Sequence, residues 1–249
     1  MTNGAWEVAG PDDGPLIVFI HGTRLTRTSW RAVVLRLSDT YRCLCVDLPG
    51  HGALADEPFS LDAAADCIDA AIDDAHGGPA VLVGLSLGGY VAMTAAARSP
   101  GRVRGLVLTG STAEPSGITA LAFRLFAWAL VAAPERQLDA LNTWAFRRRY
   151  PAEIAEPIVA AGYWPRGGAV AVRSLTKTRF RDRLRAYGGP TLVINGGLDL
   201  IFRLGERSFL RDIPNVSRRV LPLSGHLTPL DLPDAFASAV RAFMERLEN

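Results

Sequence analysis

Runs of consecutive apolar residues alternate along the chain with segments in which apolar residues recur every three or four positions. The run at 16–20 contains no polar residue and is typical of a parallel strand that is buried on both faces. The alternation predicts right-handed strand-helix-strand connections, and therefore a mainly parallel α/β sheet with helices on both faces. Strands are predicted at 6–9, 16–20, 41–46, 81–85, 103–109, 191–195 and 217–221, and helices at 29–37, 61–75, 89–98, 203–212 and 233–247.

The alternation stops between residues 112 and 187, where the sequence contains no convincing strand. We interpret this stretch as a helical insertion over the edge of the sheet. The predicted domain organisation is an α/β core of residues 1–111 and 189–249 with a helical cap, or lid, at 112–188. Helices of the insertion are predicted at 118–131, 135–150, 152–163 and 170–185.

A serine between two glycines follows the apolar run at 81–85, and a helix-prone segment of small residues comes next. This order of strand, sharp turn and helix is the pattern of a nucleophile elbow, with Ser86 as the nucleophile. Side chains larger than hydrogen at Gly84 and Gly88 would clash in so tight a turn. The amide of Leu87 lies in the first turn of the helix, where unpaired N–H groups suit a developing oxyanion. A serine without a catalytic role in a glycine-rich turn is the alternative.

An acid and a base follow Ser86 in the loops after two later predicted strands. Asp199 and His226 complete the chain order Ser, Asp, His, and of the four histidines only His226 follows that acid. A serine hydroxyl needs a base to remove its proton, and the base needs an acid that fixes its tautomer and stabilises its charged form. Glu114 and Asp231 also lie in predicted loops and stay open as alternative acids, although Asp231 is close to His226 along the chain.

The loop after the strand at 16–20 is the candidate for a second oxyanion donor, because ligands gather beyond the carboxyl ends of parallel strands. We predict that the backbone amide of Thr23 supplies this donor together with the amide of Leu87. His21 is interpreted as a structural ring that packs this loop. Asp47 and His51 are interpreted as residues that support the turn after the strand at 41–46.

Taken together, these motifs resemble the α/β-hydrolase fold family, and in particular its serine hydrolases with a helical cap. The resemblance covers nearly the whole chain outside the cap. It implies a sheet of about eight strands or slightly fewer, a triad of Ser86, Asp199 and His226, and an oxyanion hole built from two backbone amides. It implies no metal and no organic cofactor. The motifs that carry it are residues 16–22, 47–52, 84–88, 196–199 and 225–226.

Two features depart from the family pattern. A proline often follows the acid loop in the family, whereas residues 200–203 have the sequence LIFR, so this loop is expected to differ in shape. Arg24, next to the predicted oxyanion residue, is also unusual. Arg24 could pair with a carboxylate or enolate of the substrate, and the alternative is an arginine that faces outward.

The predicted cap is rich in aromatic residues and in positive charge. Trp128 and Trp144 are candidate substrate-binding residues, although aromatic residues at helical spacing are also common in cores. Residues 112–188 contain 11 Arg and 1 Lys against 4 Glu and 2 Asp, a local net charge of +6. This charge could attract an anionic substrate or a cofactor-linked thioester, and a solvated basic face is the alternative.

Composition narrows the class of protein further. The 249 residues are 49% apolar and 21% charged, which fits one soluble globular unit. A net charge of +2 and the lack of interleaved basic and aromatic motifs argue against a nucleic-acid partner. The sequence predicts no membrane span and no secretion signal, so we expect a cytoplasmic monomer or homodimer. The odd number of cysteines, Cys43, Cys45 and Cys67, favours reduced core thiols over a metal site or a disulfide.

These observations predict a serine hydrolase that cleaves an ester or lactone of a mainly apolar small molecule through an acyl-enzyme. A carbon–carbon bond hydrolase or a lyase with the same triad is an open alternative. A non-enzymatic ligand receptor with this fold is another, because a fold alone does not determine a function. A dehalogenase is disfavoured, because that resemblance would require an aspartate at position 86.

Overall fold

The computed structural model describes residues 4–248, and within this range seven strands form one sheet in the order β1-β3-β2-β4-β5-β6-β7. β1 (Trp6–Ala9) pairs with β3 (Arg42–Val46) in antiparallel orientation, and every other neighbouring pair is parallel. The predicted mainly parallel α/β sheet of eight strands or slightly fewer is confirmed. The remaining strands are β2 (Leu16–Ile20), β4 (Ala80–Leu85), β5 (Val103–Thr109), β6 (Thr191–Gly196) and β7 (Val216–Leu221).

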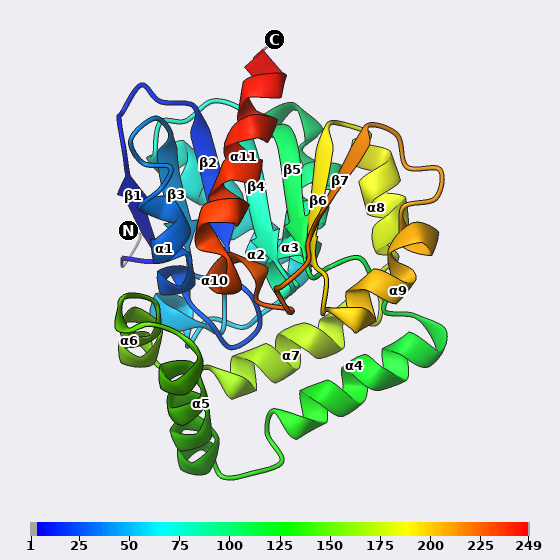
Figure 1. Ribbon diagram of the computed structural model, residues 1–249. Coiled ribbons are helices and arrows are strands. Elements are labelled where there is room, and N and C mark those ends of the chain that lie inside the picture. Colours follow the sequence, from blue (N-terminus) through cyan, green and yellow to red (C-terminus); the bar gives the residue numbers. More distant parts are fainter. Residues whose placement is uncertain (1–3, 249) are drawn as a thin grey trace.

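The central strands are apolar on both faces because helices cover both faces of the sheet. All five residues of β2 are buried, and the β2 residues alternate between two separate hydrophobic clusters. Val18 and Ile20 pack in one cluster with α2 (Leu61–Asp74) and α3 (Leu87–Arg98). The opposite cluster contains side chains of α1 (Arg31–Val34) and α11 (Pro233–Glu248), which Figure 1 shows on the other side of the sheet from α2 and α3.

Residues 112–188 contain helices and no strand in the structure. α4 (Gly117–Ala129) and α7 (Pro165–Leu175) lie side by side across the carboxyl edge of the sheet (Figure 1). α5 (Glu135–Arg149) and α6 (Ala152–Ala161) pack against each other near the short helix η1 (Arg27–Trp30), which leads into α1. Helices therefore cover the edge at which the parallel strands end.

The predicted single helix at 170–185 is wrong, because two helices occupy this stretch. α7 ends at Leu175, and α8 (Phe180–Tyr187) begins four residues after Thr176, the residue that caps α7. The carboxylate of Glu114 accepts hydrogen bonds of 2.8 and 3.0 Å from the first two amides of α8, which fixes its start. α8 packs against α3 beside the sheet, away from the helices that cross the carboxyl edge.

Smaller differences concern helix boundaries. The predicted helix at 29–37 is divided between η1 and α1, and α9 (Leu200–Phe209) begins directly after Asp199 rather than at residue 203. Short helices at η2 (Gly52–Leu54), η3 (Pro100–Arg102) and α10 (Thr228–Asp231) lie in loops. In the described part of the chain, no helix combines the length and the apolar character needed to cross a bilayer.

All three cysteines are free thiols. Cys43 and Cys45 are buried in β3, and burial raises the pKa of Cys43 to about 12. Cys67 is half-buried in α2, and burial raises the pKa of its thiol to about 11. These thiols therefore remain protonated near neutral pH, when a thiol is least reactive.

Candidate active site

Ser86 lies at the sharp turn between β4 and α3. Its backbone has φ 53° and ψ −114°, and positive φ is uncommon for a residue other than glycine. A Cβ atom at Gly84 would lie 2.5 Å from the backbone of Gly88, and one at Gly88 would lie 2.1 Å from the carbonyl oxygen of Ile20. Both positions therefore require glycine, and the turn holds Ser86 in a strained conformation at the carboxyl edge of the sheet.

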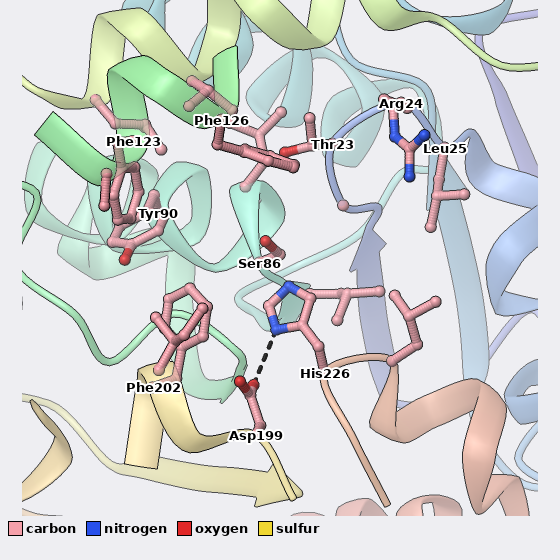
Figure 2. Close-up of a pocket in the computed structure, with 18 residues that line it drawn as sticks. Thr23, Arg24, Leu25, Ser86, Tyr90, Phe123, Phe126, Asp199, Phe202 and His226 are labelled. Atoms are coloured by element: carbon pink, nitrogen blue, oxygen red, sulfur yellow. Dashed lines mark hydrogen bonds and ion pairs between the residues drawn. The ribbon is translucent and has the colours of Figure 1, made fainter. Parts of the chain in front are cut away.

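His226 and Asp199 meet beside Ser86, although each comes from a different loop. The Nδ1 atom of His226 lies 2.8 Å from Oδ2 of Asp199, whose side chain is only 5% exposed. Because an ionised carboxylate only accepts hydrogen bonds, the Nδ1 atom carries the proton and donates it. Figure 2 shows the imidazole between Asp199 and Ser86, with its second ring nitrogen on the side of Ser86. The ring of Phe202 stacks on the imidazole at a centroid distance of 4.9 Å.

The two alternative acids have other partners. Glu114 binds the amides at the start of α8, as described above. Asp231 accepts a hydrogen bond of 2.7 Å from the amide of Gly225 and is paired with the guanidinium of Arg149. Asp199 is therefore the carboxylate that contacts the imidazole of His226.

Thr23 and Leu87 both line the cavity that contains Ser86. Leu87 is the first residue of α3, so its amide belongs to the unpaired N–H groups at the start of that helix. Thr23 lies in the loop after β2, and Figure 2 shows it above Ser86 on the side opposite to Asp199. This placement leaves the two residues as the candidates for the oxyanion donors.

His21 and His51 are buried, and both rings contact the backbone of the loops that follow β2 and β3. His21 accepts a hydrogen bond of 3.0 Å from the amide of Leu48, and its Nδ1 atom lies 2.9 Å from the next carbonyl oxygen. Burial lowers the pKa of His21 to about 4 and that of His51 to about 3, so both rings are neutral near pH 7. Asp47 is paired with Arg27 and accepts hydrogen bonds from two backbone amides. The Nδ1 atom of His51 lies 3.1 Å from the carbonyl oxygen of Pro49. These contacts agree with the structural roles predicted for the three residues.

A cavity of about 400 Å³ extends from Ser86 beneath the helices of the insertion (Figure 2). Side chains from the core loops form one part of its wall, and side chains from α4 and α7 form the other part. Most of the wall is apolar, which suits a small apolar ligand. Prominent members of the wall are Tyr90, Phe123, Phe126, Val172, Ile201 and Leu227.

The structure does not bring the two predicted tryptophans to this cavity. Trp128 is 65% exposed and Trp144 is 64% exposed, and neither belongs to the cavity wall. Phe123 and Phe126 of α4 occupy the wall instead. For Trp128 the reason is that α4 is apolar around most of its circumference, so its sequence contains no polar stripe that marks the outer face. Trp144 lies on α5, which contributes no side chain to the cavity wall. Arg24, by contrast, does line the cavity.

Within residues 4–248, no three His, Cys, Asp or Glu side chains are grouped so that they could hold a metal ion. The titratable residues in the cavity wall are Arg24, Tyr90, Asp199 and His226. Burial raises the pKa of Tyr90 well above its usual range, and its hydroxyl donates a hydrogen bond of 2.6 Å to the carbonyl of Ala113. Besides the hydroxyl of Ser86, the cavity wall therefore presents one imidazole and one carboxylate that contact each other.

Comparison with known proteins agrees with the observed fold. A model of the alpha/beta hydrolase family matches residues 17–239, which is most of the chain. The chain belongs to the α/β-hydrolase family. This result confirms the predicted fold and the predicted resemblance.

Two relatives show how the α/β-hydrolase fold is used elsewhere. The pimeloyl-[acyl-carrier protein] methyl ester esterase of Neisseria meningitidis serogroup C is 31% identical, over 94% of this chain and 95% of the relative. The 2-(acetamidomethylene)succinate hydrolase of Mesorhizobium japonicum is 29% identical, over 93% of this chain and 88% of the relative.

Among solved structures, a thermophilic esterase from Thermogutta terrifontis superposes with a TM-score of 0.80 at 28% identity. The superposition covers 98% of this chain and 94% of that chain. The prediction of an α/β-hydrolase enzyme of the carboxylic ester hydrolase class is confirmed.

Proposed function

We propose that this α/β-hydrolase cleaves a carboxylic ester or lactone of a mainly apolar small molecule through a triad of Ser86, His226 and Asp199. The observation that carries the proposal is the 2.8 Å contact between His226 and Asp199 beside a strained serine in an apolar cavity. A strained serine at a strand-to-helix turn, with an imidazole that is oriented by a buried carboxylate, is the arrangement that activates a hydroxyl for acyl transfer.

In the proposed mechanism, the free ring nitrogen of His226 removes the proton of the Ser86 hydroxyl as its oxygen attacks the carbonyl carbon. Asp199 holds the imidazole in the required tautomer and stabilises the imidazolium that forms. His226 then gives the proton to the departing alcohol oxygen, which leaves an ester of Ser86. A water molecule, deprotonated by the same imidazole, attacks this acyl-enzyme and releases the acid and the free serine.

The amides of Thr23 and Leu87 would stabilise the negative charge that develops on the carbonyl oxygen. Backbone amides need no reorganisation when this charge appears, so they lower the barrier more than water would. Removal of one such donor typically costs about 10² to 10³ in kcat. The oxyanion hole in this proposal therefore accounts for a large part of the rate.

We also propose that α4, α5, α6 and α7 act as a cap over the core. The support is that α4 and α7 supply part of the cavity wall, including Phe123, Phe126 and Val172. α8 packs against α3, so the structural cap ends before residue 188 in this proposal. The cap would exclude water from the acyl-enzyme until the leaving group has departed.

The cavity and the relatives support the proposed chemical class of the substrate. The volume of about 400 Å³ lies in the range of small-molecule pockets, and its wall is mostly apolar. A relative named as a methyl ester esterase supports an ester with a small alcohol group. Carbon–carbon bond hydrolysis and lyase chemistry by the same triad remain the alternatives that the following experiment separates.

The test is labelling by a fluorophosphonate probe, followed by turnover of p-nitrophenyl esters of increasing acyl length. Wild-type protein should be labelled and should hydrolyse the short esters, and Ser86→Ala should show neither property. Ser116→Ala is the matched control, because Ser116 is exposed and lies outside the cavity wall. Labelling at Ser86 without ester turnover would exclude the proposed substrate class, and a lack of labelling would exclude the triad.

A further inference from the structure

Arg24 directly follows the proposed oxyanion residue and lines the same cavity as Ser86 and His226. Its backbone has φ 67°, a left-handed conformation that arginine seldom adopts. Asp199, the acidic residue in the cavity wall, is already bonded to the imidazole. Arg24 therefore places a permanent positive charge in a wall that is otherwise mostly apolar.

The cap fixes the position of Arg24. Its Nη1 atom donates a hydrogen bond of 2.9 Å to Oδ1 of Asn142 in α5, and its carbonyl oxygen accepts one of 3.2 Å from the amide of Trp164. A guanidinium group has five N–H donors in a rigid planar fork. Among the described residues, Asn142 takes one of these donors, and no carboxylate lies within ion-pair distance. The Arg24 guanidinium is thus fixed by Asn142, and several of its N–H donors remain available to a ligand.

The electrostatic environment of Arg24 also favours an anion. Burial lowers the pKa of Arg24 because the charged guanidinium loses hydration, and the nearby Tyr163 and Asp139 oppose this shift without cancelling it. The carboxyl group of Asp139 is itself partly desolvated, and burial raises its pKa. A poorly hydrated cation without a paired carboxylate is costly, and a bound anion with direct hydrogen bonds would compensate for that cost.

The two sides of Ser86 differ in character. Figure 2 shows Arg24 on one side of the serine, near Thr23, and shows Tyr90 and Phe123 on the other. A substrate whose carbonyl sits at Ser86 would therefore place different chemical groups on the two sides. The apolar side suits a hydrocarbon part, and the side of Arg24 suits an anionic oxygen group.

We infer that Arg24 is a specificity-determining residue that binds a carboxylate of the substrate, so that the preferred substrates are esters or lactones that also carry a free carboxylate. This inference rests on the proposed ester hydrolysis at Ser86. A bidentate contact between a guanidinium and a carboxylate provides both binding energy and a fixed orientation. The carboxylate would thereby hold the ester carbonyl between the nucleophile and the two amides.

The experiment compares two methyl esters of equal chain length, monomethyl adipate, which has a free carboxylate, and methyl hexanoate, which is neutral. Wild-type protein should prefer monomethyl adipate. Arg24→Gln should lower kcat/KM for monomethyl adipate by about tenfold to a hundredfold, mainly through KM, because a hydrogen bond to a charged group is lost. The same variant should leave kcat/KM for methyl hexanoate within about twofold, and Arg24→Lys should restore part of the preference.

Arg124→Gln is the matched control, because Arg124 lies on α4 in the cap but is exposed and outside the cavity wall. If the basic cap attracted anions without a specific site, Arg124→Gln would reduce the preference as much as Arg24→Gln, and the inference would be wrong. An equal loss for both esters in Arg24→Gln would also overturn it, since Arg24 would then only hold the cap in place.

A binding measurement separates this inference from the proposed function. Calorimetric titration with monomethyl adipate should give a dissociation constant about tenfold weaker or more for Ser86→Ala, Arg24→Gln than for Ser86→Ala alone. Turnover of neither ester by the wild type would exclude the ester hydrolase proposal and leave the binding result decisive for Arg24. Equal affinity of the two variants would exclude a carboxylate site at Arg24.

Discussion

The carboxylate of Asp231 accepts a hydrogen bond of 2.7 Å from the backbone amide of Gly225, the residue directly before His226. The same carboxylate lies 2.7 Å from a guanidinium nitrogen of Arg149 and accepts a hydrogen bond of 2.8 Å from the hydroxyl of Tyr150. Its side chain is only 7% exposed, so solvent screens these contacts weakly. The loop of the proposed base is thereby tied to the C-terminal end of α5 in the proposed cap.

Asp231→Asn should reduce kcat roughly tenfold with a smaller change in KM. The amide nitrogen of asparagine is a donor, so it would oppose the donors of Arg149 and loosen the loop that positions His226. Steady-state kinetics on a p-nitrophenyl ester would measure the effect. Asp234→Asn is the control, because Asp234 is exposed and pairs with Arg36 away from the site. Wild-type kcat in a folded Asp231→Asn would show that this contact has no part in positioning the base.

Gly110→Ala should remove most activity, on the order of a hundredfold or more in kcat, because it displaces the imidazole from its reacting position. A Cβ atom at Gly110 would lie 2.6 Å from Cε1 of His226, and Gly110 has φ +59°. Gly117 has nearly the same φ, +58°, and a Cβ atom there would have no neighbour within 4 Å. Gly117→Ala should therefore lower the free energy of unfolding by about 1 kcal/mol through the same backbone strain, without the contact with His226.

Turnover of p-nitrophenyl butyrate and thermal unfolding of both variants would separate these two effects. Gly117→Ala should keep nearly full activity despite its lower stability. Similar losses of activity in both variants would mean that backbone strain, and not the position of His226, explains the result for Gly110→Ala.

The free energy of unfolding should fall as the pH decreases below about 6.5. Burial lowers the pKa of His21 to about 4 and of His51 to about 3 in the folded protein, whereas both have pKa values near 6.5 in an unfolded chain. Below pH 6.5 the unfolded chain therefore binds more protons than the folded chain. The stability of the folded protein is complete above that pH, and it decreases as the pH falls toward 4 for His21 and toward 3 for His51. The full effect is on the order of 3 kcal/mol for His21 and about 5 kcal/mol for His51, because the pKa of His51 is lowered further.

Urea unfolding at pH 8, 6 and 5 would measure this dependence. His51→Gln should unfold with a shallower pH dependence between pH 6.5 and 5, whatever its stability at pH 8. An identical slope in wild type and in this variant would show that His51 is not held neutral by its burial.

The catalytic candidates were predictable because each follows a strand in a recognisable local pattern. Gly84 and Gly88 mark the elbow through the space that a Cβ atom would need, and this requirement is local in sequence. Asp199 and His226 follow β6 and β7, and parallel strands bring their carboxyl ends to one edge. The family match confirms the fold that this reasoning predicted.

The features that the sequence did not predict depend on contacts between distant residues. The break between α7 and α8 is stabilised by Glu114, 66 residues before Phe180, so no local pattern reveals it. The choice of Phe126 over Trp128 for the cavity wall depends on which side of α4 meets α7. Because both sides of α4 are apolar, periodicity alone could not distinguish them.

The most direct test of the proposed mechanism is the hydrolysis of p-nitrophenyl butyrate by wild type and by Ser86→Ala, with Ser116→Ala as the control. The proposed mechanism predicts that loss of the nucleophile lowers kcat by a factor on the order of 10⁶, and that the control keeps wild-type activity. If kcat of folded Ser86→Ala were lower than that of wild type by less than about tenfold, Ser86 would not be the nucleophile, and the proposed acyl-enzyme mechanism would be wrong.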